Sequence, residues 1–226
     1  MISAVIPAHN EEKTIGGVIN ALKEAGIGEI IVVDDGSSDT TAQIAEGLQA
    51  KVIKQKKRSG KGAAIKKGIK SASGEVIVFV DADLIGLDHK KIVKLITPVA
   101  KGKADFVKGY GYFNVNKALE KDNINITKEV VEPLFKAYFP ELNIIDTLSG
   151  QWCAKKDFLL KAEMPDDYGV DVSVLLDAYN SNLKIAQENL GYMEHNSSKD
   201  PAKENERKQE MANQISTAIK KKIGIK

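Results

Sequence analysis

The 226-residue sequence contains a single cysteine, Cys153, and no apolar run that approaches the ~20 residues of a membrane-spanning helix. One cysteine cannot form an internal disulfide bond, and no Cys/His spacing resembles a zinc site, so we expect a protein of the reducing cytoplasm. The N-terminus lacks a basic segment followed by a long apolar one, and we therefore expect no signal peptide. The formal net charge is only +2, which argues against nucleic acid as a partner.

Two common nucleotide-binding motifs are also absent. The G-x-G-x-x-G fingerprint does not follow the first expected strand, and the chain has no G-x-x-x-x-G-K-S/T loop. These absences argue against a dehydrogenase and against a P-loop kinase.

Short apolar runs alternate with amphipathic stretches through the first half of the chain. The pattern predicts strands at residues 3–7, 29–33, 52–54 and 76–80, and helices over residues 12–25 and from about Thr40 and Gly62. Repeated strand–helix alternation predicts an α/β fold with a mostly parallel sheet covered by helices. The expected strands are apolar throughout, which is typical of strands buried on both faces.

The second half of the chain is richer in helical patterns. We expect a strand at 104–113, a mobile polar loop at 114–125, helices at 126–139, 155–162 and 171–180, and a short strand at 184–191. From Pro201 a charged helix carries four apolar residues at spacings of four, namely Met211, Ile215, Ile219 and Ile223. We expect this helix to dock on the core, with dimerisation or membrane-surface contact as alternatives. No flexible linker interrupts the sequence, so we expect a single domain.

Four polar clusters follow the four expected strands. They are residues 7–12 (PAHNEE), 34–41 (DDGSSDTT), 58–64 (RSGKGAA) and 81–84 (DADL). Each has an ordinary explanation, because Ser38 or Asp39 can cap a helix and the glycines can shape a turn. Ligands of open α/β sheets, however, collect beyond the carboxyl ends of the strands. Four clusters at the same edge therefore indicate a ligand site.

The chemistry of these clusters predicts a nucleoside diphosphate bound with a divalent cation. Asp81 and Asp83 supply hard oxygen ligands, which suit Mg²⁺ or Mn²⁺ shared with phosphate oxygens. Lys61, which lies between two glycines at an expected helix start, can place an ammonium group on the same phosphates.

Several segments carry a resemblance to a known family. Three of them resemble the nucleotide-sugar-binding half of GT-A glycosyltransferases: VIPAHNEE, VVDDGSSDTTA and VFVDADL. Others are similar, in order, to glucosyl-3-phosphoglycerate synthases and the related mannosyl enzymes: GKGAAI, ADFVKGYGY, ITKEVVEPLFKAYFPEL, LSGQWCAKKDFL, YGVDVSVLLDAY and NLGYMEHNSS. The resemblance implies a GT-A (Rossmann-like) domain over residues 1–226. Residues 1–110 would be its nucleotide-sugar half, 111–200 its acceptor half and 201–226 a C-terminal helix.

The resemblance also implies roles on the donor side of the site. Pro7, Ala8 and Glu11 would line the nucleobase and ribose pocket, and Asp35 or Ser37 would help to hold the base. Lys61 would meet the diphosphate and Asp81 the ribose side. Asp83 and His195 would bind the metal ion, and a neutral imidazole suits Mn²⁺ better than Mg²⁺.

On the acceptor side, the resemblance implies that the sugar and acceptor are surrounded by Leu148, Ser149, Gly150, Tyr168 and Asp171. Asp171 stands where the family carries a glutamate. Trp152 remains open between a sugar-stacking residue and a core residue.

The chain departs from the family at the acceptor phosphate. The family's Gly-Arg-x-Thr stretch corresponds here to residues 124–127, so Asn125 replaces the arginine while Thr127 is kept. An asparagine amide supplies no charge to a phosphate, unlike an arginine fork. Either Lys121 or Lys128 compensates, or the acceptor is not 3-phosphoglycerate.

These features predict a metal-dependent glycosyltransferase that moves a hexose from a nucleotide sugar to a small phosphorylated acceptor. UDP-glucose and retention are implied by the resemblance, with Lys61, Asp83 and Asp171 as the catalytic residues. Asp171 is the candidate base should the enzyme invert.

The alternatives are a polyprenol-phosphate sugar transferase at a membrane surface and a nucleotide-sugar-binding protein without catalysis. A sugar-nucleotide pyrophosphorylase is disfavoured because PAHNEE stands where those enzymes carry a glycine-rich loop. The sequence leaves the donor base and a possible homodimer open.

Overall fold

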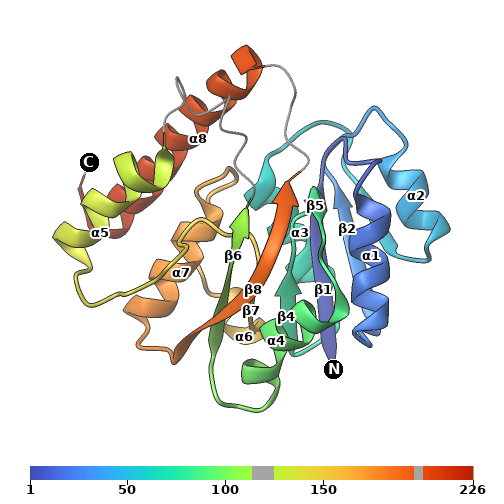
Figure 1. Ribbon diagram of the computed structural model, residues 1–226, viewed down its shortest axis with the longest axis horizontal. Coiled ribbons are helices and arrows are strands. Elements are labelled where there is room, and N and C mark those ends of the chain that lie inside the picture. The colour runs from blue at the N-terminus through green and yellow to red at the C-terminus, as the bar shows by residue number, and fades with distance from the viewer. Residues whose placement is uncertain (114–124, 196–200, 226) are drawn as a thin grey trace.

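The computed structural model describes residues 1–113, 125–195 and 201–225 (Figure 1). The expected polar loop at 114–125 lies outside the described residues except for Asn125, and Lys121 lies outside them as well.

The first half of the chain has the predicted alternation of strands and helices. Its elements are β1 (Ile2–Ala8), α1 (Ile15–Glu24), β2 (Glu29–Asp34), α2 (Thr41–Gly47), β3 (Lys51–Lys54), α3 (Lys61–Ser71) and β4 (Val76–Phe79). Helix α1 begins three residues later than expected. The carbonyl oxygen of Glu11 accepts bonds from the backbone N–H groups of Thr14 and Ile15 (3.1 and 3.0 Å), so the chain turns before it enters the helix.

The rest of the chain contains three elements that the sequence pattern did not predict: the two-residue strand β5 (Leu84–Ile85), helix α4 (His89–Ala100) and strand β7 (Trp152–Lys155). The other elements are β6 (Phe106–Phe113), the π-helical turn η2 (Thr127–Val131), α5 (Glu132–Tyr138), α6 (Lys156–Leu159), α7 (Val170–Asn180), β8 (Ile185–His195) and α8 (Pro201–Lys222). The helix expected at 155–162 is reduced to α6. Its first residue belongs to β7, and at its end the N–H groups of Lys161 and Ala162 both bond to the carbonyl oxygen of Phe158 (3.0 and 3.1 Å), which closes a turn instead of a further helical turn. Strand β8 continues to His195, four residues beyond the predicted end.

The strands form one sheet in the order β3-β2-β1-β4-β7-β6-β8-β5. Strands β1 to β4 pair in parallel, as predicted, and so do β6 and β8. Strand β7 runs antiparallel to both β4 and β6. This reversal brings the residues before β7 to the edge where β4 and β6 end, which is the edge of the four polar clusters.

Helices cover both faces of the sheet (Figure 1). On one side, residues of α3, α5, α7 and α8 pack with the sheet into one apolar cluster. Residues of α1, α2 and α4 form a second cluster on the other side. Trp152 is fully buried in the first cluster, where its ring stacks on Phe79 with a centroid distance of 3.8 Å.

The C-terminal helix α8 docks on the core, as the sequence predicts. Ile215 and Ile219 are buried, and the helix packs along α7. The apolar side of α8 is therefore covered within the chain. In the part of the chain that the structure describes, no helix is long and apolar enough to cross a membrane.

We expect the substitution Gly62→Ala to destabilise the fold. A Cβ atom at Gly62, in the first turn of α3, would lie 1.9 Å from the backbone oxygen of Pro165. Overpacking of this kind costs about 1–3 kcal/mol of unfolding free energy. Urea denaturation of the purified variant measures the loss.

Gly17→Ala is the matched control, because Gly17 is an exposed residue of α1 whose added Cβ atom would meet nothing within 4 Å. Replacing a helical glycine by alanine gains about 0.5–1 kcal/mol. Equal unfolding free energies for the two variants would show that α3 does not lie closely against residue 165.

Candidate functional site

The two loops that follow β1 and β2 are bound to each other. The backbone N–H of Asn10 donates to Ser37 Oγ (2.9 Å), and the Asn10 side chain accepts from the Ser38 N–H (2.8 Å). The Glu11 N–H donates to Thr41 Oγ1 (2.7 Å). Ser37 therefore lies beside the loop that follows Pro7 and Ala8 at the end of β1.

Asp35 is buried and its carboxylate organises the loop before α3. One oxygen accepts from Gln55 Nε2 and from the Ser59 N–H, both at 2.7 Å, and the other accepts from the Gly60 N–H at 2.8 Å. Both oxygens already have partners within the chain. A contact of Asp35 with a nucleobase therefore stays a prediction.

Two glycines let the start of α3 approach another part of the chain. Gly60 has a φ of +98°, which a residue with a side chain rarely adopts. A Cβ atom at Gly60 would lie 2.3 Å from the Asp166 oxygen, and that oxygen accepts a hydrogen bond from the Ala63 N–H (3.0 Å). This close contact joins the first half of the chain to the segment that leads into α7.

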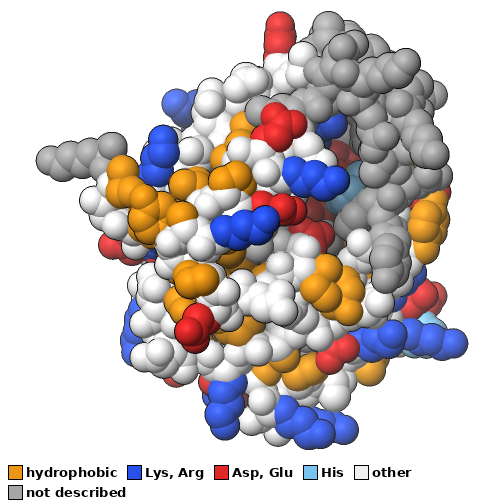
Figure 2. Space-filling view, turned by 60° about the vertical axis from the view of Figure 1, so that its left-hand side comes forward, with side chains coloured by type: hydrophobic (Ala, Val, Ile, Leu, Met, Phe, Trp, Pro, Cys, Tyr) orange, Lys and Arg blue, Asp and Glu red, His pale blue; other side chains and the backbone are white. Residues whose placement is uncertain are grey.

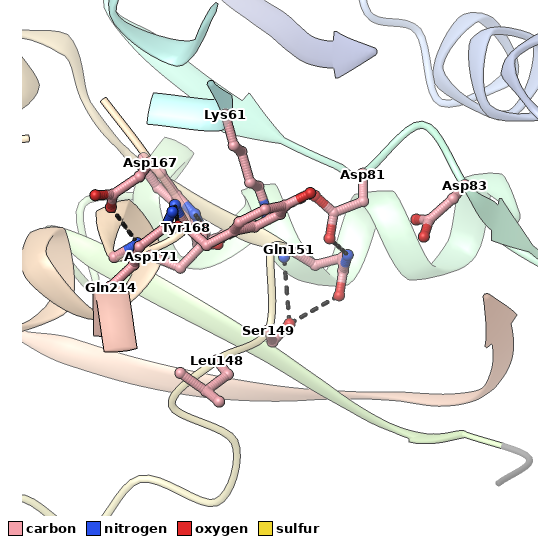
Figure 3. A network of polar contacts seen from close by, with 12 residues as sticks. Lys61, Asp81, Asp83, Leu148, Ser149, Gln151, Asp167, Tyr168, Asp171 and Gln214 are labelled. Atoms are coloured by element: carbon pink, nitrogen blue, oxygen red, sulfur yellow. Dashed lines mark hydrogen bonds and ion pairs between the residues drawn. The ribbon is translucent and has the colours of Figure 1, made fainter. Parts of the chain in front are cut away.

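Lys61 lies at the centre of the site, between two carboxylates from different elements (Figure 3). Its Nζ atom is 2.7 Å from Asp81 Oδ1 and 2.8 Å from Asp171 Oδ2. Burial alone would lower the pKa of Lys61, but the charges of Asp171 and Asp81 outweigh burial and raise it. Lys61 is therefore a firmly protonated ammonium group.

Asp171 is held from its other side by Trp152. The indole Nε1–H donates to Asp171 Oδ1 (2.9 Å), and Asp171 is buried in the first turn of α7. The structure thus decides the open question about Trp152, which is a core residue that orients a carboxylate of the site.

Asp81 is oriented by the segment before β7, which includes Gln151, a residue that the sequence analysis did not single out. Gln151 Nε2 donates to Asp81 Oδ2 (3.0 Å), and Ser149 Oγ donates to Gln151 Oε1 (2.8 Å) (Figure 3). A Cβ atom at Gly150 would lie 2.1 Å from Asp81 Oδ2. Burial would raise the pKa of Asp81, but Lys61 lowers it below its usual value, so Asp81 is an anion.

Asp146 was also missed by the sequence analysis, and it shapes the same segment. Its Oδ1 atom accepts from the backbone N–H groups of Leu148 (3.1 Å) and Ser149 (3.0 Å). Burial raises the pKa of Asp146. Its position before a turn of small and polar residues was the only signal in the sequence.

Asp83 and His195 form a separate pair next to this network. The Nδ1 atom of His195 is 3.1 Å from Asp83 Oδ1, because β5 and β8 pair with Leu84 opposite His195. The two side chains are 23% and 35% exposed, respectively. Burial would lower the pKa of His195, but the hydrogen bond to Asp83 and the charges of Asp83 and Asp81 raise it.

The donor set of Asp83 and His195 fits a divalent cation that shares its other ligands with phosphate and water, because such ions need only one or two protein groups. Among the residues that the structure describes, no group of three or more His, Cys, Asp and Glu side chains could hold a metal ion by itself. Figure 2 shows acidic side chains and a histidine side by side at a hollow in the surface, with basic side chains nearby.

The remaining predicted residues have their hydrogen bonds outside the Lys61 network. The Tyr168 hydroxyl accepts a long hydrogen bond from the Arg58 guanidinium group (3.5 Å). The backbone N–H of Tyr168 donates to the Gln214 side chain of α8 (3.2 Å). Asn125 accepts from the Lys128 N–H (3.1 Å) and thereby caps the turn that begins at Thr127. Within the described residues, no hydrogen bond or ion pair links Asn125 or Thr127 to the Lys61 network.

The chain matches a family model and several named relatives. Residues 3–161 match the model of Glycosyl transferase family 2. The chain is 32% identical over 212 residues to glucosyl-3-phosphoglycerate synthase of Mycolicibacterium smegmatis, a match that covers 86% of this chain and 70% of the relative. It is 31% identical over 218 residues to the Mycobacterium tuberculosis enzyme, with 86% and 66% covered. The chain thus spans about two thirds of the length of these relatives.

Solved structures extend the similarity to the whole fold. Glucosyl-3-phosphoglycerate synthase from Mycobacterium tuberculosis, in complex with Mn²⁺, UDP and glucosyl-3-phosphoglycerate, is 29% identical with a TM-score of 0.87, and the match covers 100% of this chain and 81% of that one. The same enzyme with Mg²⁺ and UDP also gives a TM-score of 0.87 at 29% identity, with 100% and 80% covered. These matches confirm the predicted GT-A fold.

The family model covers more than half of the chain, and the relatives and structures agree with it. The chain therefore belongs to glycosyl transferase family 2, as a glycosyltransferase of the GT-A fold that is similar to glucosyl-3-phosphoglycerate synthases.

Proposed function

We propose that this chain transfers glucose from UDP-glucose to a small phosphorylated acceptor such as 3-phosphoglycerate, with bound Mg²⁺ or Mn²⁺ and with retention at the anomeric carbon. The observation that carries this proposal is the ammonium group of Lys61, held between Asp81 and Asp171 beside the Asp83–His195 pair. Related structures contain Mn²⁺, UDP and the glucosylated product. We further propose that the chain acts as a single domain in the cytoplasm.

On the donor side, we assign the nucleobase and ribose to the wall formed by Pro7, Ala8, Glu11 and Ser37. The mutual hydrogen bonds of the two loops support this assignment, because they give the wall its shape without a ligand. Asp35 acts from behind this wall, through the loop that it holds before α3.

Lys61 is suited to stabilise the departing diphosphate. An ammonium group has three N–H donors, and Asp81 and Asp171 accept two of them. The third remains for a phosphate oxygen. A donor that is already fixed in place stabilises the charge that develops on the leaving group, with little reorganisation during the reaction.

The metal ion would be held by Asp83 and His195. When bound, it would supply positive charge to the oxygens of the diphosphate and so make UDP a better leaving group. The imidazole of His195 must be neutral to act as a ligand.

The transfer itself breaks the bond between the anomeric carbon and the β-phosphate oxygen. UDP leaves with the electron pair, the acceptor hydroxyl oxygen bonds to the anomeric carbon, and its proton passes to the departing phosphate.

Asp171 has both oxygens occupied by donors, Lys61 and Trp152. This supports a role in holding Lys61 and the sugar, together with Leu148, Ser149, Gly150 and Tyr168, and it favours retention over inversion by an Asp171 base.

The acceptor assignment must account for the absent arginine at Asn125. Asn125 supplies a helix cap through its side chain, so the charge has to come from elsewhere. Lys128 has an exposed side chain next to Thr127, and we propose that it helps to bind the acceptor phosphate. The covered apolar side of α8 favours a small acceptor over a polyprenol phosphate at a membrane surface.

The first test is release of nucleoside diphosphate by the purified protein. We expect release from UDP-glucose with Mn²⁺ that depends on 3-phosphoglycerate, and less release from GDP-mannose. Glycerol 3-phosphate serves as a second acceptor, and proton NMR of the first-formed product gives its anomeric configuration. If the protein binds or slowly hydrolyses a donor but 3-phosphoglycerate changes nothing, the acceptor assignment is wrong. An inverted product contradicts retention.

The metal assignment is tested with Asp83→Asn. Loss of a residue that only orients a metal ligand typically weakens metal binding about 10- to 100-fold, so loss of the carboxylate ligand itself is expected to raise the Mn²⁺ concentration needed for half-maximal activity by at least this factor. A titration of activity against Mn²⁺ measures this. Asp88→Asn is the matched control, because Asp88 lies in the same segment but caps α4 and should leave the titration unchanged. An unchanged titration for Asp83→Asn would rule out Asp83 as a ligand.

The role of Lys61 is tested with Lys61→Met. Loss of a preorganised donor to the leaving group typically costs about 10²–10³ in kcat, and we expect a loss of this size. The control is Lys66→Met on the same helix, where Lys66 pairs with Asp166 at the surface (2.6 Å). Circular dichroism checks that both variants fold. Equal turnover of the two variants would contradict the assignment.

A further inference from the structure

Lys108 of β6 is buried in the floor of the site without a partner. Its side chain is 1% exposed. Its Nζ atom has no hydrogen-bond partner, a condition that Thr147 Oγ1 shares within the described part of the chain. An unpaired buried ammonium group is costly unless nearby charges compensate for it. The charges around Lys108 therefore decide what this residue does.

The sheet places Lys108 beneath Asp171. Lys108 on β6 lies opposite Trp152 on β7, and opposite residues of antiparallel strands point to the same face of the sheet. Trp152 donates to Asp171 from this face. Asp171 makes the largest favourable charge interaction with Lys108, followed by Asp146 and then Asp81, while Lys61 opposes them. These groups come from α7, the segment before β7, the loop after β4, and α3.

Before the metal ion and the donor bind, the two buried carboxylates lack one positive charge. Lys61 alone serves two carboxylates, Asp81 and Asp171, which leaves one negative charge in excess. A diphosphate adds further negative charge close by. Lys108, when protonated, balances the two carboxylates before the donor arrives.

We propose that Lys108 is a positioning residue of the donor site: its buried ammonium group neutralises the Asp81–Asp171 pair together with Lys61, and so allows an anionic nucleoside diphosphate to bind above it. The part that concerns the donor rests on the function proposed above. Lys108 does not touch the diphosphate, and it acts through the carboxylates.

Titration of Lys108 provides a signature that needs no substrate. Burial lowers the pKa of Lys108 to about 8, with Asp171 and Asp146 acting in the opposite direction. Lys108 is therefore charged at neutral pH and loses its charge above pH 8. The only tryptophan of the sequence, Trp152, lies opposite Lys108, and indole emission responds to a nearby charge.

The experiment is a pH titration of Trp152 fluorescence in the ligand-free protein. We expect a step near pH 8 in the wild type and in Lys155→Met, and no such step in Lys108→Met. Lys155 is the matched control because it ends the same strand as Trp152 but pairs with Asp105 at the surface (2.7 Å). A His195→Gln variant that keeps the step excludes the histidine as its source. A wild type without the step, or a Lys108→Met variant that retains it, overturns the proposal.

Unfolding free energy gives an independent readout. The pKa of Lys108 lies lower in the folded chain than the usual 10.5, so the unfolded chain binds more protons between about pH 8 and 10.5. The stability of the wild type, measured relative to Lys108→Met, should therefore rise with pH across this window. The variant itself should fold, because methionine fills a similar apolar space. A flat difference between the two proteins contradicts a lowered pKa of Lys108, and a rise that already begins well below pH 8 contradicts a charged Lys108 at neutral pH.

Calorimetric titration with UDP and Mn²⁺ tests whether Lys108 helps the donor nucleotide to bind. We expect Lys108→Met to bind UDP about tenfold more weakly than the wild type, which corresponds to about 1.4 kcal/mol. Lys155→Met should bind as the wild type does. If Lys108→Met binds UDP as tightly as the wild type does, Lys108 has no role in donor binding. A wild type that binds neither UDP nor GDP overturns the proposed function instead, and the fluorescence step still decides the charge of Lys108.

Discussion

The site depends on one interaction, the ammonium group of Lys61 held between Asp81 and Asp171. Each partner comes from a different part of the chain: the start of α3, the loop after β4 and the first turn of α7. Because all three groups are largely buried, their charges interact through a medium that screens them less than water does. The interaction therefore ties the two halves of the chain together at the centre of the candidate site.

The surrounding structure is arranged to keep these three groups in place. Trp152 and Gln151 each donate to one carboxylate, and both belong to the segment that the reversed strand β7 delivers to this edge of the sheet. The glycines beside Lys61 allow α3 to lie against the backbone that leads into α7. Carboxylates held in this way cannot turn to follow a ligand, which suits a site that stabilises charge on a leaving group.

The acceptor side differs from the donor side in how the chain builds it. The donor loops follow parallel strands and bind each other through many hydrogen bonds. The segment where the resemblance places a phosphate-binding arginine instead begins a π-helical turn capped by Asn125. In the proposed function, the charge that meets the acceptor phosphate therefore comes from another residue.

The sequence alone determined the α/β class, the strand–helix alternation of the first half and the edge of the sheet at which the four polar clusters lie. Local periodicity reveals each βα unit, and the carboxyl ends of parallel strands necessarily meet at one edge. The resemblance of the motifs added the GT-A fold. Only the tertiary structure decided the direction of β7, the core position of Trp152 and the burial of Lys108. It also decided the ion pair between Lys61 and Asp171, which lie 110 positions apart. Such contacts depend on which distant segments the fold brings together. Local patterns in a single sequence reflect only neighbouring residues, so they do not predict these contacts.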